Sequence, residues 1–324
     1  MTTAPEATRR TMPLPVSAPD DAPPPTRLAE PGSVLWEGAG LVTFSLSNGC
    51  AFLLQTMEPS IAAVVDKHSV FRTDPVGRGM RSLASVMMWV YSDAESLQEV
   101  QRLRELHAPL EAVDEDGVRH TALSSGPWAW VLLTGMHAFV EATRVFGEIS
   151  DDADAESVYA EMKQLMRGFR VAEKEIPATY ADFREHFDRV VTEHLRDTQV
   201  AHDFLHGARH PGPPLGLPRW LRPVWSLGVA PIGHFQHLAI VGMIPPSARA
   251  TLGVRWGRPQ ELQLRVFGRV VGRLVPLLPE RVRYFPIAYE ARRLERLRRE
   301  RPHDHRAIAR AERRLRTVID KRPT

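Results

Sequence analysis

The sequence has very little cysteine: Cys50 is the only one in 324 residues. One cysteine excludes an intramolecular disulfide framework, a paired-cysteine zinc site and a thioredoxin-type redox motif. We therefore expect a protein of the reducing cytoplasm.

Long hydrophobic runs are also missing. A membrane-spanning helix needs about 20 consecutive apolar residues. The most apolar stretch, 127–140, is shorter than this and contains His137. The sequence therefore predicts no transmembrane segment.

The common catalytic signatures are absent as well. The chain has no GxxxxGK[ST] phosphate loop, no GxGxxG after a strand, no HExxH and no GxSxG. Any chemistry must therefore come from individual polar residues on the apolar faces of predicted helices, where burial requires a partner or a ligand.

What is present is an ordinary globular composition, 43% hydrophobic and 25% charged, which predicts a buried core. Residues 1–31 hold eight prolines and few large apolar groups, so we expect a disordered arm there. We assign 32–289 to one large domain and 290–324 to a basic helical tail.

Helix-period patterns dominate this large domain and predict an all-α fold. The one plausible strand is 118–123, and 207–218 is a predicted loop because its prolines and glycines cannot continue a helix. Helices are predicted near 48–57, 59–70, 77–92, 94–108, 127–146, 154–168, 180–199, 218–242, 246–252, 258–275 and 284–318, the last with a break at Pro302.

Positive charge is concentrated in the tail. Residues 290–324 carry 13 Lys/Arg and 6 Asp/Glu, a net +7 in a chain whose total is +3. The acids are spaced to form pairs within a helix, which favours a solvated or interacting tail over nucleic-acid binding. Weak contact of 290–324 with a membrane surface or an acidic partner is the remaining interpretation.

One histidine stands out in the predicted helix 94–108. Val100, Leu103 and His107 follow helical spacing, so His107 faces inward. Pro109 cannot donate a backbone hydrogen bond to the Glu105 carbonyl. That carbonyl or another acceptor would fix one imidazole nitrogen and leave the other as a ligand. The alternative is a core histidine bonded to backbone.

The preceding helix carries two cations and a hydroxyl on one side, namely Arg78, Arg81 and Ser82. Such a group suits an anionic ligand, such as a propionate, or the polarisation of bound oxygen. Equally, the two arginines could bridge carboxylates such as Asp66 and Asp74.

Other histidines and the tryptophans are weaker candidates. His68 and His137 are the next potential ligands. His234 and His237 have metal-ligand spacing without nearby carboxylates, which favours structural roles. The tryptophans Trp89, Trp128 and Trp130 are more typical of core than of a cofactor wall.

An ordered series of motifs resembles the catalytic domain shared by MpaB-type oxygenases and rubber oxygenases (latex-clearing proteins), over roughly 31–290. The motifs are PGSVLW at 31–36, FLLQTMEPSIAAVVDKHS at 52–69, FRTDPVGR at 71–78, RS at 81–82, LH at 106–107, WV at 130–131, YAEM at 159–162, IPP at 244–246 and LP at 278–279.

The resemblance implies an all-helical, globin-reminiscent domain that binds haem b and uses O2 as co-substrate. Latex-clearing proteins cleave isoprenoid double bonds, and the fungal namesake cleaves a prenyl side chain. His107 is similar to the proximal haem ligand and would be the metal residue. Arg78, Arg81 and Ser82 are similar to the distal, catalytic positions, and His68 and His137 are further candidates for cofactor contact.

Two departures from the family pattern matter. The usual distal lysine is Arg81, which is a poor iron ligand. The usual histidine of the following motif is Leu132, and His137 falls near the usual aspartate.

Two functions follow. The first is a haem-dependent oxygenase that oxidises or cleaves an apolar unsaturated, isoprenoid-like small molecule, with Glu58 or Asp66 as a weakly assigned base. The alternative is a non-catalytic helical protein that binds a hydrophobic ligand and has lost or altered the cofactor site.

Overall fold

The computed structural model describes residues 28–93, 95–114, 116–147, 152–213, 218 and 222–323. Within these ranges the chain forms fifteen α-helices and one two-stranded sheet, which confirms the predicted all-α class. Most of the predicted arm 1–31 lies outside the described residues. Its last part is described, and there Leu28 and Ala29 are buried in the core.

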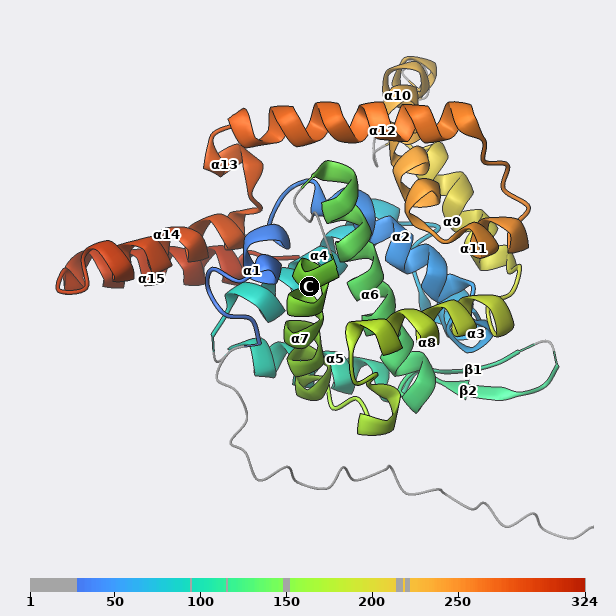
Figure 1. The fold of residues 1–324 in the computed structure, drawn as a ribbon, viewed down its shortest axis with the longest axis horizontal. Helices are drawn as coiled ribbons and strands as arrows, with labels where there is room; N and C mark the ends of the chain where they lie inside the picture. The colour runs from blue at the N-terminus through green and yellow to red at the C-terminus, as the bar shows by residue number, and fades with distance from the viewer. Residues whose placement is uncertain are drawn as a thin grey trace, which may run out of the picture.

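The centre of the fold is α6 (Ser125–Phe146), an apolar helix with most of its side chains buried. α2 (Phe44–Thr56) packs along it, and Figure 1 shows both helices within the body of the molecule. Polar groups at this contact are satisfied: Trp130 Nε1 donates to the Leu54 carbonyl at 3.2 Å, and Gln55 Nε2 donates to Thr134 Oγ1 at 2.9 Å. Burial of this apolar face is the main stabilising term of the core.

α4 (Pro75–Tyr91) and α5 (Glu95–His107) form the helix pair that carries most of the candidate residues. α4 begins with Pro75 after an Asp74 cap that accepts from the Gly77 N–H at 2.9 Å. Because the connection between the two helices is short, they run antiparallel. The end of α5 therefore lies beside the start of α4.

A buried carboxylate joins this pair. Glu99 is 2% exposed and accepts from Ser85 of α4 at 2.7 Å, from Arg102 at 2.6 Å and from Arg322 at 3.4 Å. Desolvation alone would raise the pKa of Glu99, but the hydrogen bonds from Arg102 and Ser85 lower it overall. Glu99 is therefore charged at neutral pH.

The sheet is a hairpin of β1 (Glu111–Val113) and β2 (Arg119–Thr121), with Ala112 opposite His120. The predicted strand 118–123 contains β2. Its partner β1 was not predicted, because three residues are too few to show an alternating pattern.

The remaining predicted helices of the main body are present except around residue 199, and two short helices, α1 and α13, were not predicted. The predicted helix 180–199 is wrong: α8 ends at Glu193 and a separate helix, α9, begins at Gln199, capped by Thr198. Part of the predicted loop 207–218 is also helical, since α9 continues through Gly207 to Arg209. The helices are α1 (Val34–Gly38), α3 (Pro59–His68), α7 (Asp152–Gly168), α8 (Tyr180–Glu193), α9 (Gln199–Arg209), α10 (Arg222–Met243), α11 (Pro246–Thr251), α12 (Arg258–Leu274) and α13 (Glu280–Arg283).

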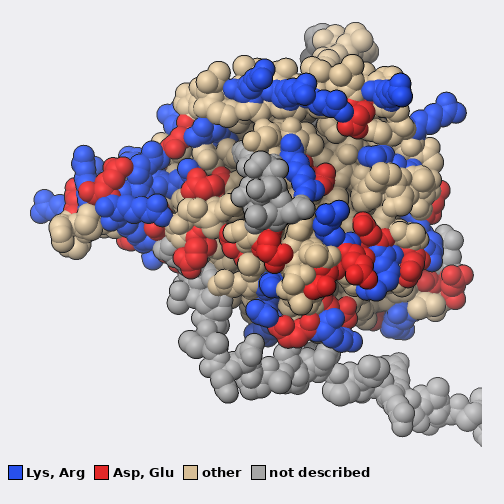
Figure 2. Space-filling model, in the orientation of Figure 1, with Lys and Arg blue, Asp and Glu red and all other residues tan. Residues whose placement is uncertain are grey.

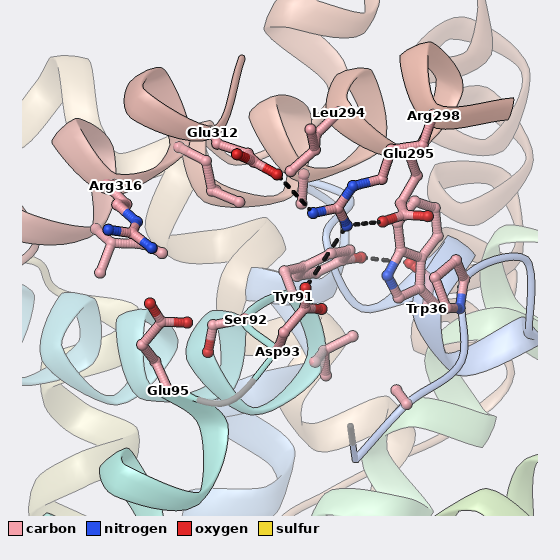
Figure 3. A pocket seen from close by; sticks show the side chains of 16 residues that line it. Trp36, Tyr91, Ser92, Asp93, Glu95, Leu294, Glu295, Arg298, Glu312 and Arg316 are labelled. Carbon is pink, nitrogen blue, oxygen red and sulfur yellow. Dashed lines mark hydrogen bonds and ion pairs between the residues drawn. The ribbon is translucent and has the colours of Figure 1, made fainter. Parts of the chain in front are cut away.

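The basic tail is a helical hairpin of α14 (Pro286–Glu300) and α15 (His305–Asp320), with the predicted break at Pro302. It projects from the body in Figure 1, and Figure 2 shows Lys and Arg gathered over it. Arg298 bonds to Glu295 at 2.6 Å and Glu312 at 3.0 Å, and it lies 3.6 Å from Asp93 (Figure 3). Acids from both the hairpin and the body thus offset part of its charge.

α10 alters one expectation. By length and composition it contains a segment, Pro223–Met243, that could cross a membrane, where the sequence predicted none. Core helices of soluble proteins pass the same test, but only 33% of this window is buried, and the buried residues are concentrated in the last six of α10, 238–243.

The Glu99 network gives a stability prediction. Glu99→Gln removes the charge that pairs with Arg102 and Arg322, so we expect the free energy of unfolding to fall by about 2 kcal/mol. Urea denaturation at pH 7 measures it, with the exposed Glu105→Gln on the same helix as the control. Equal midpoints for the two variants would contradict the importance assigned to Glu99.

Candidate functional site

The site is built where the start of α4 meets the end of α5. Arg78, Arg81 and Ser82 lie in the first two turns of α4, and His107 is the last residue of α5. Since the helices are antiparallel, these four residues lie at the same end of the pair. The structure therefore places the four residues at one end of the helix pair, where the Arg78 charge acts on His107.

His107 is held by a backbone acceptor. Its Nδ1 donates to the Leu103 carbonyl at 2.7 Å, and its ring packs edge-on against Trp128 with centroids 5.6 Å apart. The backbone acceptor is Leu103 and not Glu105, and this bond agrees with both sequence interpretations, the fixed ligand and the core histidine bonded to backbone. In the described part of the chain Nε2 has no hydrogen-bond partner, so this nitrogen has a free lone pair.

The electrostatic surroundings keep this imidazole neutral. Burial lowers the pKa of His107, and the positive charges of Arg78 and Arg102 lower it further. The hydrogen bond to Leu103 opposes them only in part. A neutral imidazole with a free Nε2 is the form that binds a metal.

Arg78 is a half-buried cation whose guanidinium lies over the Phe52 ring, 3.7 Å from its centroid. Burial, together with the neighbouring Arg81 charge, lowers the pKa of Arg78 to about 10. No carboxylate of the described ranges lies within ion-pair distance of it. A desolvated cation in this state favours an anionic or electron-rich partner.

Arg81 and Ser82 differ in whether they have a bonding partner. Arg81 pairs with Asp74 at 3.2 Å, as one of the two sequence interpretations proposed, whereas Asp66 pairs instead with Arg72 at 2.7 Å. Ser82 is half-buried and has no hydrogen bond to any residue that the structure describes. Its hydroxyl is therefore free to donate.

Trp89 was predicted to be a core residue, but its indole N–H was not considered as a donor. It lies three helical turns after Arg78, on the same side of α4 as Ser82, and its buried Nε1 has no partner among the described residues. Its ring packs against Phe169 at 4.6 Å, and Phe169 in turn contacts Trp128 at 6.2 Å. The eleven-residue spacing from Arg78 was the available signal.

His68 and His137 lie elsewhere. The exposed His68 bonds through Nε2 to the Glu111 carbonyl at 2.9 Å. His137 donates from Nε2 to the Met243 carbonyl at 2.8 Å and stacks on Phe187 at 4.4 Å. Both histidines therefore make contacts that explain their positions without a cofactor.

The remaining candidates also have structural partners. Glu58 caps α3 by accepting from the Ile61 N–H at 2.8 Å. Leu132 is buried in the main core. His234 contacts Arg209 at 3.1 Å and Gln263 at 3.2 Å.

Cavities and metal clusters do not add to this site. Figure 3 shows a pocket of about 110 Å³ where the basic hairpin meets Trp36 and Tyr91, away from His107. Across the described ranges, no three His, Cys, Asp or Glu side chains gather as a metal site. What the site offers is one imidazole opposite a cation and a hydroxyl.

The buried His137 predicts a pH effect on stability. Burial lowers the pKa of His137, despite the Glu141 charge and the Met243 hydrogen bond, which raise it. The unfolded chain therefore takes up a proton below about pH 6.5 before the folded chain does, and stability falls as pH falls.

We expect His137→Gln, which can still donate to Met243, to lose less stability between pH 7.5 and 5.5 than the parent protein. Chemical denaturation at both pH values measures this, with the exposed His303→Gln as the control. An unchanged pH dependence in His137→Gln would contradict the prediction.

Comparison with known proteins gives one finding that bears on this geometry. The family model described as ER-bound oxygenase mpaB/B'/rubber oxygenase, catalytic domain, matches residues 36–273, which is most of the chain. Curated proteins and solved structures give no match. The match includes α4, α5 and α6 with all the candidate residues, and the chain therefore belongs to the mpaB and rubber oxygenase catalytic-domain family.

Proposed function

We propose that this member of an oxygenase family is a haem-dependent oxygenase, which uses O2 to oxidise or cleave an apolar, unsaturated, isoprenoid-like small molecule. The observation that carries the proposal is His107. Its Nδ1 is fixed by Leu103, and its Nε2, at the end of α5 beside Arg78, has no partner among the described residues.

The donors of this site fit haem b. His107 Nε2 would hold the iron, and the Arg78 guanidinium, which has no acceptor among the described residues, would donate to the ligand. The two propionates of haem are acceptors of the right charge. When bound, haem b supplies an iron centre that activates O2.

The chain's own residues would then orient the imidazole ring and stabilise negative charge at the site. The Leu103 carbonyl fixes the imidazole ring and raises its basicity as a ligand. Arg78 would stabilise negative charge, and Ser82 would donate a hydrogen bond. Arg81, held by Asp74, has fewer free donors for this purpose.

We further propose a cytoplasmic location and a small-molecule substrate rather than a nucleic acid. The single, buried Cys50 supports the location. The ion pairs that offset charge in the basic hairpin weigh against a nucleic-acid surface.

A second candidate function is a non-catalytic protein that binds a hydrophobic ligand. Two observations favour it: Leu132 is packed into the core, and Arg81 is paired with Asp74. In that case His107 would be a structural histidine.

His107→Ala separates the two functions. Protein produced with ample haem should show a Soret band that responds to reduction and carbon monoxide, and the variant should lose or shift it because the iron ligand is gone. The exposed His68→Ala is the matched control and should keep the spectrum. A colourless, iron-free parent protein would reject the haem proposal and support the binding protein.

Substitutions of the two arginines of α4 should differ in their effect on haem binding. Arg78→Gln should weaken haem binding by about tenfold or more, the equivalent of one charge-assisted hydrogen bond. Arg81→Gln should change it less than about threefold, because Asp74 already holds that side chain. Haem titration of the apoprotein measures both, and equal losses would contradict the role given to Arg78.

A further inference from the structure

We propose that the outer face of α10 and α12 is a docking surface for a bilayer that contains anionic phospholipid. The surface lies apart from His107, and vesicle binding can be measured without turnover. The inference therefore goes beyond the proposed function and can fail independently of it.

Exposed apolar side chains are concentrated on this face. The described residues include 17 large apolar side chains that are exposed, and 11 of them fall between 224 and 282. Soluble monomers rarely expose such a concentration unless it is an interaction site. The 11 are Val224, Leu227, Ile232, Phe235, Leu262, Val266, Val270, Leu274, Leu277, Leu278 and Val282.

The outward direction of the α12 stripe is fixed by close packing on its other side. Leu262, Val266, Val270 and Leu274 recur every fourth residue and point to solvent. The opposite side packs on α6 and α10. A Cβ at Gly268 or Gly272 would lie 2.4 or 2.2 Å from a carbonyl oxygen of α6, so only glycine permits this approach. Rotating α12 to bury its stripe would place larger side chains at that contact.

Basic residues run beside the stripe and decide which partner fits. α12 carries four arginines, Arg258, Arg265, Arg269 and Arg273, and one acid, Glu261, which pairs with Arg265 at 3.6 Å. Figure 2 shows the positive row along the edge where α12 lies. Arg269 and Arg273 have no carboxylate within ion-pair distance in the described part of the chain. An apolar stripe flanked by unpaired arginines is typical of helices that lie in the interface of an anionic membrane.

A groove next to this row could seat a lipid headgroup. It has a volume of about 450 Å³, lies between α12 and the end of α6, and is lined by Arg265, Arg269 and Arg273 among others. Lipid phosphates are acceptors that match this lining.

α10 adds an uncharged, exposed segment that can enter the bilayer but not cross it. No charged residue occurs between 223 and 233, and Val224, Leu227 and Ile232 are exposed there. The last six residues, 238–243, are mostly buried within the fold. Residues 223–232, before the packed Gly233, span about 15 Å at ~1.5 Å per residue, less than the ~30 Å hydrocarbon core. Monotopic docking is the arrangement that keeps the fold intact.

The basic hairpin of α14 and α15 suits this role less well. It contributes none of the 17 exposed large apolar side chains. Several of its arginines are paired, Arg292 with Glu37, Arg296 with Glu280 and Arg298 with Glu295. Its charge alone could attract a membrane, but it offers nothing to insert.

Vesicle co-sedimentation of the full chain tests the proposal. Vesicles of phosphatidylcholine with phosphatidylglycerol should bind the protein, vesicles of phosphatidylcholine alone should bind it much less, and added salt should weaken binding. Val266→Ser with Val270→Ser should reduce binding about tenfold or more through lost apolar insertion. Arg269→Gln with Arg273→Gln should reduce it about tenfold or more through lost charge.

Two matched controls lie elsewhere on the surface. Arg306→Gln with Arg310→Gln removes two exposed charges from the hairpin, and Val113→Ser with Val118→Ser removes two exposed apolar groups near the sheet. Each should change vesicle binding less than about twofold if the α12 face is the contact. Circular dichroism verifies that all four variants are folded.

Three results would overturn the proposal. The parent protein could fail to bind anionic vesicles, or the α12 variants could bind like the parent while the hairpin variant does not. Light scattering could instead show a dimer that the Val266→Ser, Val270→Ser variant converts to a monomer, in which case a second copy of the chain covers this face.

Discussion

Charge neutralisation at the buried Glu99 is the constraint on which the arrangement of the site depends. A carboxylate in this position is tolerated only when donors surround it. Those donors come from α4 through Ser85, from α5 through Arg102 and from the end of the chain through Arg322. Satisfying one charge therefore sets the register of α4 against α5. That register places the end of α5, with His107, beside the turn of α4 that carries Arg78 and Ser82.

The candidate site and the proposed docking face share a structural element, α2. Its Phe52 lies under the Arg78 guanidinium, and the helix also packs against α10. An apolar unsaturated substrate would partition into lipid rather than water. A protein that rests on the bilayer through α10 and α12 would meet such a substrate at high local concentration, with one rigid helix between that surface and the site.

The sequence predicted local features well and long-range partners poorly. Helical spacing was enough to turn His107 inward and to group Arg78 with Ser82, because helix faces depend only on periodicity. It could not reveal that Leu103 supplies the acceptor, nor decide that Asp74 pairs with Arg81 while Arg78 has no carboxylate partner among the described residues. The break between α8 and α9 was missed because distant residues hold the segment between them: the Arg196 N–H donates to the Met57 carbonyl, and Thr198 Oγ1 donates to the Thr56 carbonyl, 142 residues away. Partner choice of this kind is decided by tertiary packing, which a single sequence does not contain.

The contact between Glu99 and Arg322 spans 223 residues, and this separation affects how the protein is made. During synthesis α4 and α5 leave the ribosome long before residue 322 does, so the helix pair first forms with Glu99 lacking one of its cations. The final charge balance of the pair is reached only after the α14–α15 hairpin has emerged and docked. The helix pair that carries the candidate site thus takes one of its three donors from a segment beyond residue 273, where the family match ends.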